Sequence, residues 1–589
     1  MSETFLSAAT LNRASWQGLE RSVARYMLAA GWDSVRVVGQ TGDGGADVVG
    51  TINGRRWLVQ VKNYRTAVGA SVVEETEAAA SRYRADVAVV VSAGGFTEGA
   101  REARESRFRD GKRIHLWDLP ELGRRGNLLD VRAPFELRPE RFVLKGYQES
   151  TVQRIISEWQ GDAAGRALVV LATGLGKTFV AAAAVRRLLD LSPGGRVLVL
   201  AHTNDLVRQL ERAFWPFLRS DEATLVANGE ETFAWSEMGR YQFVFGSRDT
   251  FSNRVDKAGE LPSFDYVVVD ECHHLKTASF DKVLDALNVG RTDGPFLVGL
   301  TATDWRPDGS SLVSVLGDPV VRIDLVDAMK RDFLSDVDYR MFLDNIDWDV
   351  FTERHSTAGN LTPRSINKKV FIREWDEEVC ASVRRGWEEI LQLGMAPRGI
   401  VFCSTVEHAE RMAAEINSMQ FTTALAFHAS LGSVIERNRR LWDFADGRVG
   451  ILCAVDLLNE GVDVPDVNLV VFQRVTHSRR IFIQQLGRGL RLASGKKKVL
   501  VLDFVSDIRR IAEGFEIREG VEKSSHDLPE KVVAVGDAVT DGNSFRFISK
   551  GNDDINGAAF LEAWLGEMDG LAEAGDNEEV SRLRFPPTV

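Results

Sequence analysis

The sequence predicts a multidomain α/β protein: an α/β/α domain, then two lobes that are each built on a parallel sheet, then a mostly helical C-terminal extension. The chain has 589 residues, more than one hydrophobic core accommodates, so several domains are expected. Short apolar runs typical of buried parallel strands recur in two sets, between residues 167 and 303 and between residues 399 and 472. Before them, the Asn-Gly pair at residues 53 and 54 indicates a β-hairpin in a separate first domain.

The composition is that of a globular protein, with 44% apolar and 27% charged residues. No apolar run is long enough to span a bilayer and the N-terminus lacks a secretory pattern, so we expect a cytoplasmic protein with no membrane partner. The net charge of −12 argues against a broadly basic nucleic-acid binder but is compatible with a local DNA channel. The cysteines form no CxxC pair, which argues against a zinc ribbon, an iron–sulfur cluster and a disulfide framework: Cys272, Cys380, Cys403 and Cys453.

A β-hairpin in the first domain, residues 1–135, is expected to bring three polar side chains together. With the Asn-Gly pair as its loop, counting outward places Asp47 opposite Gln60, and directly opposed residues share a face of the sheet. Lys62 lies two positions beyond Gln60 and therefore on the same face. An acid, an amide oxygen and a lysine on one hairpin face suit the hydrolysis of a phosphodiester with the help of a metal ion.

In this interpretation Asp47 and the Gln60 carbonyl oxygen would hold Mg²⁺, an ion that prefers oxygen ligands. Lys62 would orient the attacking water or neutralise charge in the transition state. An exposed hairpin whose polar face meets only solvent would carry the same residues. The hairpin by itself therefore leaves both interpretations open.

A phosphate-binding loop is expected at residues 171–178, in a first lobe that covers residues 136–330. The loop follows an apolar strand and precedes a helix, which places several backbone N–H groups around one anion. Leu171 stands where the usual GxxxxGK[ST] pattern has its first glycine, so an ordinary strand-turn-helix could also carry this sequence. Lys177 would reach the β- and γ-phosphates of ATP, and the Thr178 hydroxyl would ligate Mg²⁺. The expected ATP-binding residues of the loop are Thr173, Gly174, Leu175, Gly176, Lys177 and Thr178.

Three further residues of the first lobe are expected to serve the nucleotide. Asp270 follows an apolar strand and would hold the Mg²⁺ of ATP, while the adjacent Glu271 would orient the attacking water. Gln148 precedes the phosphate loop by one helix and would read the edge of the adenine, because an amide both donates and accepts hydrogen bonds. A surface turn is the alternative interpretation for Gln148.

The second lobe is expected over residues 396–510. One of its helices would place Gln484, Arg488 and Arg491 on a single face. The two arginines suit the role of arginine fingers, which stabilise γ-phosphate charge across a lobe interface. Residues 331–395 are expected to form a helical linker that braces the lobes, and residues 511–589 an acidic extension with a helical piece at 558–565.

The first domain resembles the Mrr-like branch of the PD-(D/E)xK restriction endonucleases. The resemblance implies a restriction-endonuclease-like fold and Mg²⁺-dependent DNA cleavage by Asp47, Gln60 and Lys62. It also assigns Glu20, on the first long helix, to the metal site. The segments that carry the resemblance are residues 31–32, 41–47, 59–64, 85–91 and 94–97.

Residues 136–510 resemble the superfamily 2 helicases and translocases, in particular DExH helicases and the motor of type I and type III restriction enzymes. The resemblance implies two RecA-like lobes that bind ATP between them, with Gly461 and Asp463 near the nucleotide. It also implies that residues 202–204 and 404–405 line a nucleic-acid track. The matching segments are residues 171–178, 270–273, 301–303, 460–463 and 484–491.

Together these features predict an ATP-dependent DNA endonuclease and translocase that uses ATP and Mg²⁺ on duplex DNA. The resemblances imply a role in bacterial restriction or antiphage defence, with a separate specificity or defence-system subunit as a partner. Two alternatives remain open at this point. One is a nucleic-acid-sensing ATPase switch whose first domain binds DNA without cutting it, and the other is a DNA repair helicase with the first domain as an accessory clamp.

Overall fold

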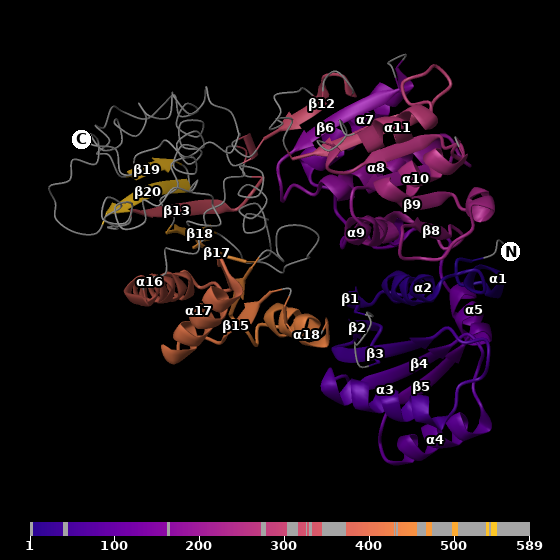
Figure 1. Cartoon of the computed structure of the whole chain (residues 1–589), viewed down its shortest axis with the longest axis horizontal. Helices are drawn as coiled ribbons and strands as arrows, with labels where there is room; N and C mark the ends of the chain where they lie inside the picture. Colours follow the sequence, from indigo (N-terminus) through magenta and orange to yellow (C-terminus); the bar gives the residue numbers. More distant parts are fainter. Residues whose placement is uncertain are drawn as a thin grey trace, which may run out of the picture.

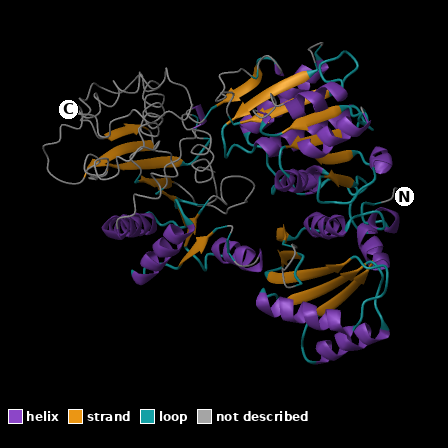
Figure 2. Cartoon of the chain, in the orientation of Figure 1, coloured by secondary structure: helices purple, strands orange, loops and turns teal. Residues whose placement is uncertain are grey.

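The chain folds into an N-terminal domain with a mixed sheet and two lobes with parallel sheets, as predicted (Figures 1 and 2). No helix of the described residues is long and apolar enough to cross a membrane. This computed structural model describes residues 4–38, 45–161, 165–258, 260–272, 278–302, 312, 316–324, 327–328, 331, 333–343, 373–428, 430–431, 434–455, 467–473, 498–504, 537–540 and 543–549.

The N-terminal domain contains a five-stranded sheet in the order β1-β2-β3-β4-β5. The pairs β1–β2 and β2–β3 are antiparallel, whereas β3, β4 and β5 run parallel. Helix α2 packs on one face of this sheet, and α3, with α4 beside it, packs on the other. The predicted α/β/α domain is therefore confirmed. Its elements are α1 (Ala8–Leu11), α2 (Trp16–Ala29), β1 (Asp33–Val37), β2 (Val48–Ile52), β3 (Arg55–Lys62), α3 (Ala70–Arg82), β4 (Val87–Ser92), α4 (Glu98–Arg109), β5 (Ile114–Asp118), α5 (Leu119–Asn127) and α6 (Pro134–Leu137).

The hairpin of β2 and β3 has the register that its loop predicts. Both loop residues have a positive φ, 51° and 71°, as a type I′ turn requires. The ladder pairs Val48 with Val59, so the next pair outward is Asp47 and Gln60. The Asp47 amide donates to the Val59 carbonyl at 2.9 Å, which extends the ladder to this position.

Lobe 1 is built on a seven-stranded parallel sheet in the order β12-β6-β11-β10-β7-β9-β8. The strands predicted from apolar runs are confirmed at β6, β7, β10 and β11, and these four are neighbours in the sheet. Its elements are α7 (Gly146–Gln160), β6 (Arg166–Leu171), α8 (Lys177–Leu191), β7 (Val197–Ala201), α9 (Asn204–Phe214), η1 (Trp215–Phe217), β8 (Thr224–Ala227), η2 (Trp235–Arg240), β9 (Phe243–Ser247), α10 (Arg248–Ala258), β10 (Tyr266–Val269), α11 (Ala278–Ala286), β11 (Phe296–Thr301) and β12 (Pro319–Ile323).

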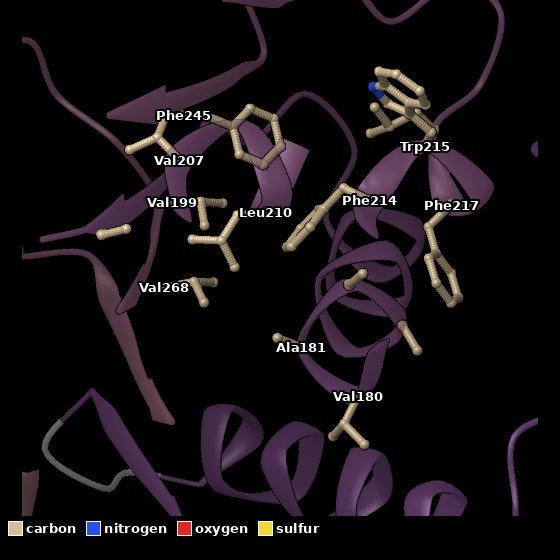
Figure 3. Close-up of a cluster of buried hydrophobic side chains, with 14 of the residues drawn as sticks. Val180, Ala181, Val199, Val207, Leu210, Phe214, Trp215, Phe217, Phe245 and Val268 are labelled. Carbon is tan, nitrogen blue, oxygen red and sulfur yellow. The ribbon is translucent and has the colours of Figure 1, made fainter. Parts of the chain in front are cut away.

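Figure 3 shows the apolar core that holds α8 and α9 against this sheet. Phe214, at the end of α9, is fully buried and packs edge-on against Phe245 of β9, with ring centroids 5.3 Å apart. Val199 of β7 and Val268 of β10 line the same cluster, and Val180 reaches it from α8. The core therefore fixes the start of α8, where the phosphate-binding loop ends, relative to the ends of the central strands.

Lobe 2 contains an eight-stranded sheet in the order β15-β16-β14-β17-β18-β13-β20-β19, parallel except for the antiparallel pair β19–β20. The predicted strands β14, β16 and β17 are confirmed and lie together in this sheet. The described elements are β13 (Asp336–Leu343), α16 (Arg373–Gln392), β14 (Gly399–Phe402), α17 (Val406–Ser418), β15 (Ala424–Phe427), α18 (Val434–Ala445), β16 (Ile451–Ala454), β17 (Leu469–Phe472), β18 (Lys498–Asp503), β19 (Asp537–Thr540) and β20 (Asn543–Ser549).

Two regions differ from the sequence-based expectation. The interval 331–395, expected to be a helical linker, contributes β13 to the sheet of lobe 2 as well as helix α16. Its charged residues pair with each other and with the neighbouring helix, since Arg340 bonds Asp338 at 2.8 Å and Glu389 of α16 at 2.7 Å. The extension 511–589, expected to be mostly helical, contributes the strands β19 and β20, which continue the sheet from β13. The expected helical piece at 558–565 lies outside the described residues.

Helix α2 joins the N-terminal domain to lobe 1 through a buried polar interface. Arg21 of α2 lies between Glu211 of α9, at 2.5 Å, and Glu231, at 2.6 Å. Arg25, one turn further, donates to the carbonyl oxygens of Glu222 at 2.6 Å and Arg219 at 2.7 Å. The apolar core of the N-terminal domain continues into that of lobe 1 around these groups. The two units are therefore fixed to each other through α2.

Candidate ATP and nuclease sites

The phosphate-binding loop has a backbone shape that requires glycine. Gly174 and Gly176 have φ of 94° and 79°, in the left-handed region that side chains rarely adopt. A Cβ on Gly176 would also lie 2.7 Å from Nε2 of Gln148. Helix α8 begins at Lys177, directly after this glycine, so its first N–H groups are oriented toward the loop. The loop thus has the geometry of an anion site at a helix N-terminus.

The side chains of Gln148 and its neighbour Tyr147 bind the backbone of this loop. The Leu175 carbonyl accepts from Tyr147 Oη at 3.1 Å and from Gln148 Nε2 at 2.9 Å. The other end of the amide, Gln148 Oε1, accepts from the Lys145 backbone N–H at 2.9 Å and caps α7. Gln148 is 6% exposed, so the surface-turn interpretation is wrong. Its contact with adenine stays a prediction.

The loop faces two adjacent carboxylates at the end of β10. Thr178 Oγ1 donates to Asp270 Oδ2 at 3.3 Å, and Lys177 Nζ lies 4.0 Å from Glu271 Oε1. Burial and the adjacent Glu271 carboxylate raise the pKa of Asp270 to about 6. Glu271 has a φ of 50°, a strained value of the kind that gathers at functional sites. Carboxylates in this position can hold the metal of a metal–nucleotide complex and a water beside its terminal phosphate, and these roles of Asp270 and Glu271 stay predictions.

The side-chain hydroxyl of Thr173 indicates whether a nucleotide fits the loop. Its Oγ1 is buried and has no hydrogen-bond partner within the described residues. A buried hydroxyl without a partner costs free energy, and a phosphate oxygen would accept its proton. The donor set of the loop, a hydroxyl, a lysine and helix N–H groups, therefore matches a polyphosphate.

In the N-terminal domain, Gln60 and Lys62 meet on the face of the sheet that α3 covers. The alternation along β3 explains this, because Val59 and Val61 belong to the core beneath α2, whereas Leu58 belongs to the core beneath α3. Gln60 is 1% exposed, so the hairpin face does not simply meet solvent.

Two residues of α3 complete this cluster, and sequence reasoning missed both. Glu75 Oε1 accepts from Gln60 Nε2 at 2.6 Å and from Lys62 Nζ at 3.2 Å. The Thr76 hydroxyl donates toward two acceptors, Gln60 Oε1 and the Val72 carbonyl at 2.7 Å. The position of Thr76 one turn after Val72 and on the apolar side of α3 was a usable signal, but nothing local distinguishes Glu75 from the other acids of that helix.

Asp47 lies at the edge of the same cluster. Its Oδ2 accepts from the Val61 backbone N–H at 2.5 Å. Gly45, two residues earlier, has a φ of 88°, and a Cβ there would lie 2.7 Å from Gln60 Nε2 and 3.0 Å from Glu75 Oε1. The segment before β2, which carries Gly45 and Asp47, therefore approaches the contact between Gln60 and Glu75 closely.

Glu20, the helical acid expected in the metal site, is buried on α2. Because α2 covers the Val59 face of the sheet, Glu20 belongs to the helix opposite Gln60 and Lys62. Its part in a metal site stays a prediction. The described residues hold no cluster of three or more His, Cys, Asp or Glu side chains in metal-binding geometry. The ligands predicted for Mg²⁺ at the hairpin are therefore a carboxylate and an amide oxygen, to which a hard ion would add water, and they stay a prediction.

The expected lobe 2 residues of the ATP site lie outside the described residues, so their roles stay predictions: Gly461, Asp463, Gln484, Arg488 and Arg491. The residues expected to line a nucleic-acid track are described. Thr203 caps α9 by accepting from the Leu206 N–H, and Thr405 caps α17 by accepting from the His408 N–H. Both loops thus follow central strands at the carboxyl edge of their sheets.

Comparison with known families assigns each of these units. The "Restriction endonuclease" family model matches residues 11–125, and that of the "Type III restriction enzyme, res subunit" matches residues 141–306. The "Helicase conserved C-terminal domain" model matches residues 384–493. The chain joins a restriction-endonuclease domain to a superfamily 2 helicase motor.

Individual relatives are consistent with this combination of domains. The chain is 26% identical over 451 residues to the type I restriction enzyme EcoAI endonuclease subunit of Escherichia coli, covering 68% of this chain and 54% of that subunit. It is 24% identical over 437 residues to the DNA 3'-5' translocase XPB2 of Sulfurisphaera tokodaii, covering 69% of this chain and 91% of the translocase. The fold is shared with the type ISP restriction-modification enzyme LlaBIII bound to DNA, with a TM-score of 0.53 at 17% identity over 95% of this chain and 42% of LlaBIII. The chain thus spans about half the length of its restriction-enzyme relatives.

Proposed function

We propose that this protein is an ATP-dependent DNA endonuclease of a restriction or antiphage defence system, in which a translocating motor acts together with the N-terminal nuclease. The observation that carries the proposal is the occurrence of both sites on a single framework. The phosphate loop faces Asp270 and Glu271, the hairpin places Asp47 opposite Gln60, and α2 fixes the two units through Arg21. A separate subunit that recognises the target sequence is the expected partner.

The residues of the motor would have separate roles in ATP hydrolysis. Lys177 and the N–H groups of α8 would bind the phosphates, and Thr178 with Asp270 would orient the magnesium complex of ATP. Glu271 would align the attacking water for in-line displacement at the γ-phosphate. Hydrolysis would open and close the two lobes and so move duplex DNA along the loops that begin α9 and α17.

The nuclease residues would act on a DNA phosphate at the hairpin. Bound Mg²⁺ would supply Lewis acidity to the scissile phosphate and acidify a water. Asp47 and Gln60 would hold the ion through oxygen atoms, and the Lys62 ammonium would orient the nucleophilic water and offset charge that develops on the phosphate. Asp47, Gln60 and Lys62 would thus act together on the face of the sheet that α3 covers.

Plasmid cleavage tests this function. Wild type, Lys177→Ala and the double variant Asp47→Ala/Lys62→Ala are incubated with plasmid and Mg²⁺, with and without ATP. We expect cutting by wild type with ATP, loss of cutting with retained ATPase in the double variant, and loss of ATPase of about 100-fold or more in Lys177→Ala. DNA that stays intact under every condition, including modified substrates and added partner subunits, would instead favour the ATPase switch with a non-cleaving DNA-binding domain.

A further inference from the structure

We propose that Glu75 of α3 provides the second carboxylate of the nuclease metal site, and that the Gln60 amide turns over when the metal binds. This inference rests on the proposed nuclease function and adds a ligand to its site. Glu75 is the acid that contacts both hairpin residues, with Oε1 2.6 Å from Gln60 Nε2 and 3.2 Å from Lys62 Nζ.

Charge is the first reason. The hairpin offers Asp47 as its acid, while position 60 carries a neutral amide. A divalent hard cation is bound by carboxylates far better than by amides alone, so a second negative ligand is needed from another element. Glu75 brings that charge from the neighbouring helix to within hydrogen-bond distance of Gln60.

The hydrogen bonds of Gln60 are the second reason. In the structure Nε2 donates to Glu75, while the Thr76 hydroxyl has two acceptors for its single proton, Gln60 Oε1 and the Val72 carbonyl at 2.7 Å. A half-turn of the amide interchanges its oxygen and nitrogen without moving other atoms. Nε2 would then donate to Thr76 Oγ1, and the Thr76 proton would go to the Val72 carbonyl alone, so the Thr76 hydroxyl would no longer serve two acceptors.

After that half-turn, two oxygen atoms would face each other, Gln60 Oε1 and Glu75 Oε1, at the 2.6 Å now spanned by the hydrogen bond. They would repel unless a cation lies beside both. Adjacent ligands in an octahedral magnesium site are about 3 Å apart, which these side chains reach with a small shift. Thr76 therefore has a hydrogen bond to Gln60 in either orientation, whereas Glu75 favours the present orientation without a metal ion and the turned one with it.

The backbone places Asp47 to join them. Gly45 passes so close that its Cβ would collide with Gln60 Nε2 and touch Glu75, and Asp47 is two residues further along. The side chain of Glu75 is 45% exposed, so it has room to move toward an incoming ion. Glu74, the residue before Glu75 on α3, pairs with Arg107 instead and provides a matched control.

Binding of Mn²⁺ to the full chain without nucleotide, followed by the electron paramagnetic resonance signal of free Mn²⁺, tests the proposal. The variants are Glu75→Gln, Glu74→Gln, Asp47→Ala and the exchange Gln60→Glu/Glu75→Gln. We expect one site in wild type that Asp47→Ala removes, an affinity at least about tenfold lower in Glu75→Gln, and no change in Glu74→Gln. The exchange returns an acid to the strand and should restore affinity to within about threefold of wild type. ATPase activity confirms that each variant is folded.

A wild-type affinity in Glu75→Gln, or no Mn²⁺ site in wild type, overturns the inference. The same variants separate it from the proposed function. If wild type never cuts DNA but Glu75→Gln loses Mn²⁺, the metal ligand is established and the nuclease function fails. If wild type cuts DNA and Glu75→Gln cuts with the same Mg²⁺ dependence, the function stands and the role of Glu75 fails.

Discussion

The ATP loop and the nuclease hairpin use the same local device. In each, a glycine in the left-handed region passes a glutamine amide, with Gly176 beside Gln148 and Gly45 beside Gln60. A Cβ would lie 2.7 Å from the amide nitrogen in both places. The sites differ in what holds the glutamine. Gln148 bonds to backbone groups, namely the Leu175 carbonyl and a helix N–H, whereas Gln60 bonds to the side chains of Glu75 and Thr76.

This difference indicates how each site is preorganised. Backbone partners are fixed by the fold, so the ATP loop has its binding shape before a nucleotide arrives. Side-chain partners can exchange, and one of those at Gln60 carries a charge, so the nuclease site responds to what binds there. The motor would then be ready for ATP at all times, while the nuclease would become competent only when its metal is present.

Removing the buried ion pairs that join the N-terminal domain to lobe 1 should have the largest effect. Arg21→Met leaves Glu211 and Glu231 buried without their shared cation, although the Thr224 and Ser15 hydroxyls still donate to them. Losing one partner of a buried ion pair costs about 3–5 kcal/mol, and we expect the lower value here because these hydroxyl bonds remain. Limited proteolysis between the N-terminal domain and lobe 1 should become faster, and the thermal transition should move down.

Arg13→Met is the matched control for Arg21→Met. Arg13 belongs to the same interface, but its pair with Glu237 spans 4.0 Å and its side chain is 41% exposed. Exposed pairs contribute about 0–1 kcal/mol, so little should change. Equal effects of the two substitutions would show that the buried triad does not hold the domains together.

Alanine substitutions at Gly176 and Gly45 test whether the ATP loop is more rigid than the nuclease site. Alanine at Gly176 must adopt a φ of 79° against an amide fixed by backbone, so we expect about 30-fold weaker ATP binding and normal metal binding at the hairpin. Alanine at Gly45 meets Glu75, which can move aside, so we expect about tenfold slower cleavage and normal ATPase. Nucleotide titration and plasmid cleavage measure the two effects. A larger loss from Gly45→Ala than from Gly176→Ala would contradict the difference in preorganisation.

The sequence was sufficient wherever a feature depends on neighbouring residues. The phosphate loop, the strands beside it and the hairpin register could all be predicted, because a turn and its two flanking segments determine them. Glu75 could not, since α3 contains Glu74, Glu75 and Glu77, and only the packing of the helix selects one. The contact of Gln148 with Leu175 was equally hidden, because its acceptor is a backbone carbonyl that has no signature in the sequence.

Strand β13 was missed for a related reason. Asp338 and Arg340 gave its segment the charged appearance of an exposed helix or linker. In the structure these charges satisfy each other and Glu389 of α16, which allows the strand to enter the sheet between β18 and β20. A pairing between two elements thus decided the conformation of the segment, and local propensity did not.

The pH dependence of nucleotide binding gives the smallest effect and sharpens the account of the ATP site. Burial and Glu271 raise the pKa of Asp270 to about 6, above the ordinary value of 3.8, so the carboxyl gains its proton as the pH falls through 6. A protonated carboxyl holds Mg²⁺ poorly, and we expect binding of a fluorescent ATP analogue with Mg²⁺ to weaken about fourfold between pH 7.5 and 5.5. Asp270→Asn should bind weakly at both pH values, with only the small change caused by the nucleotide's own phosphates. If wild type and Asp270→Asn lose affinity in parallel, the titrating group is the nucleotide, and Asp270 is already ionised throughout this range.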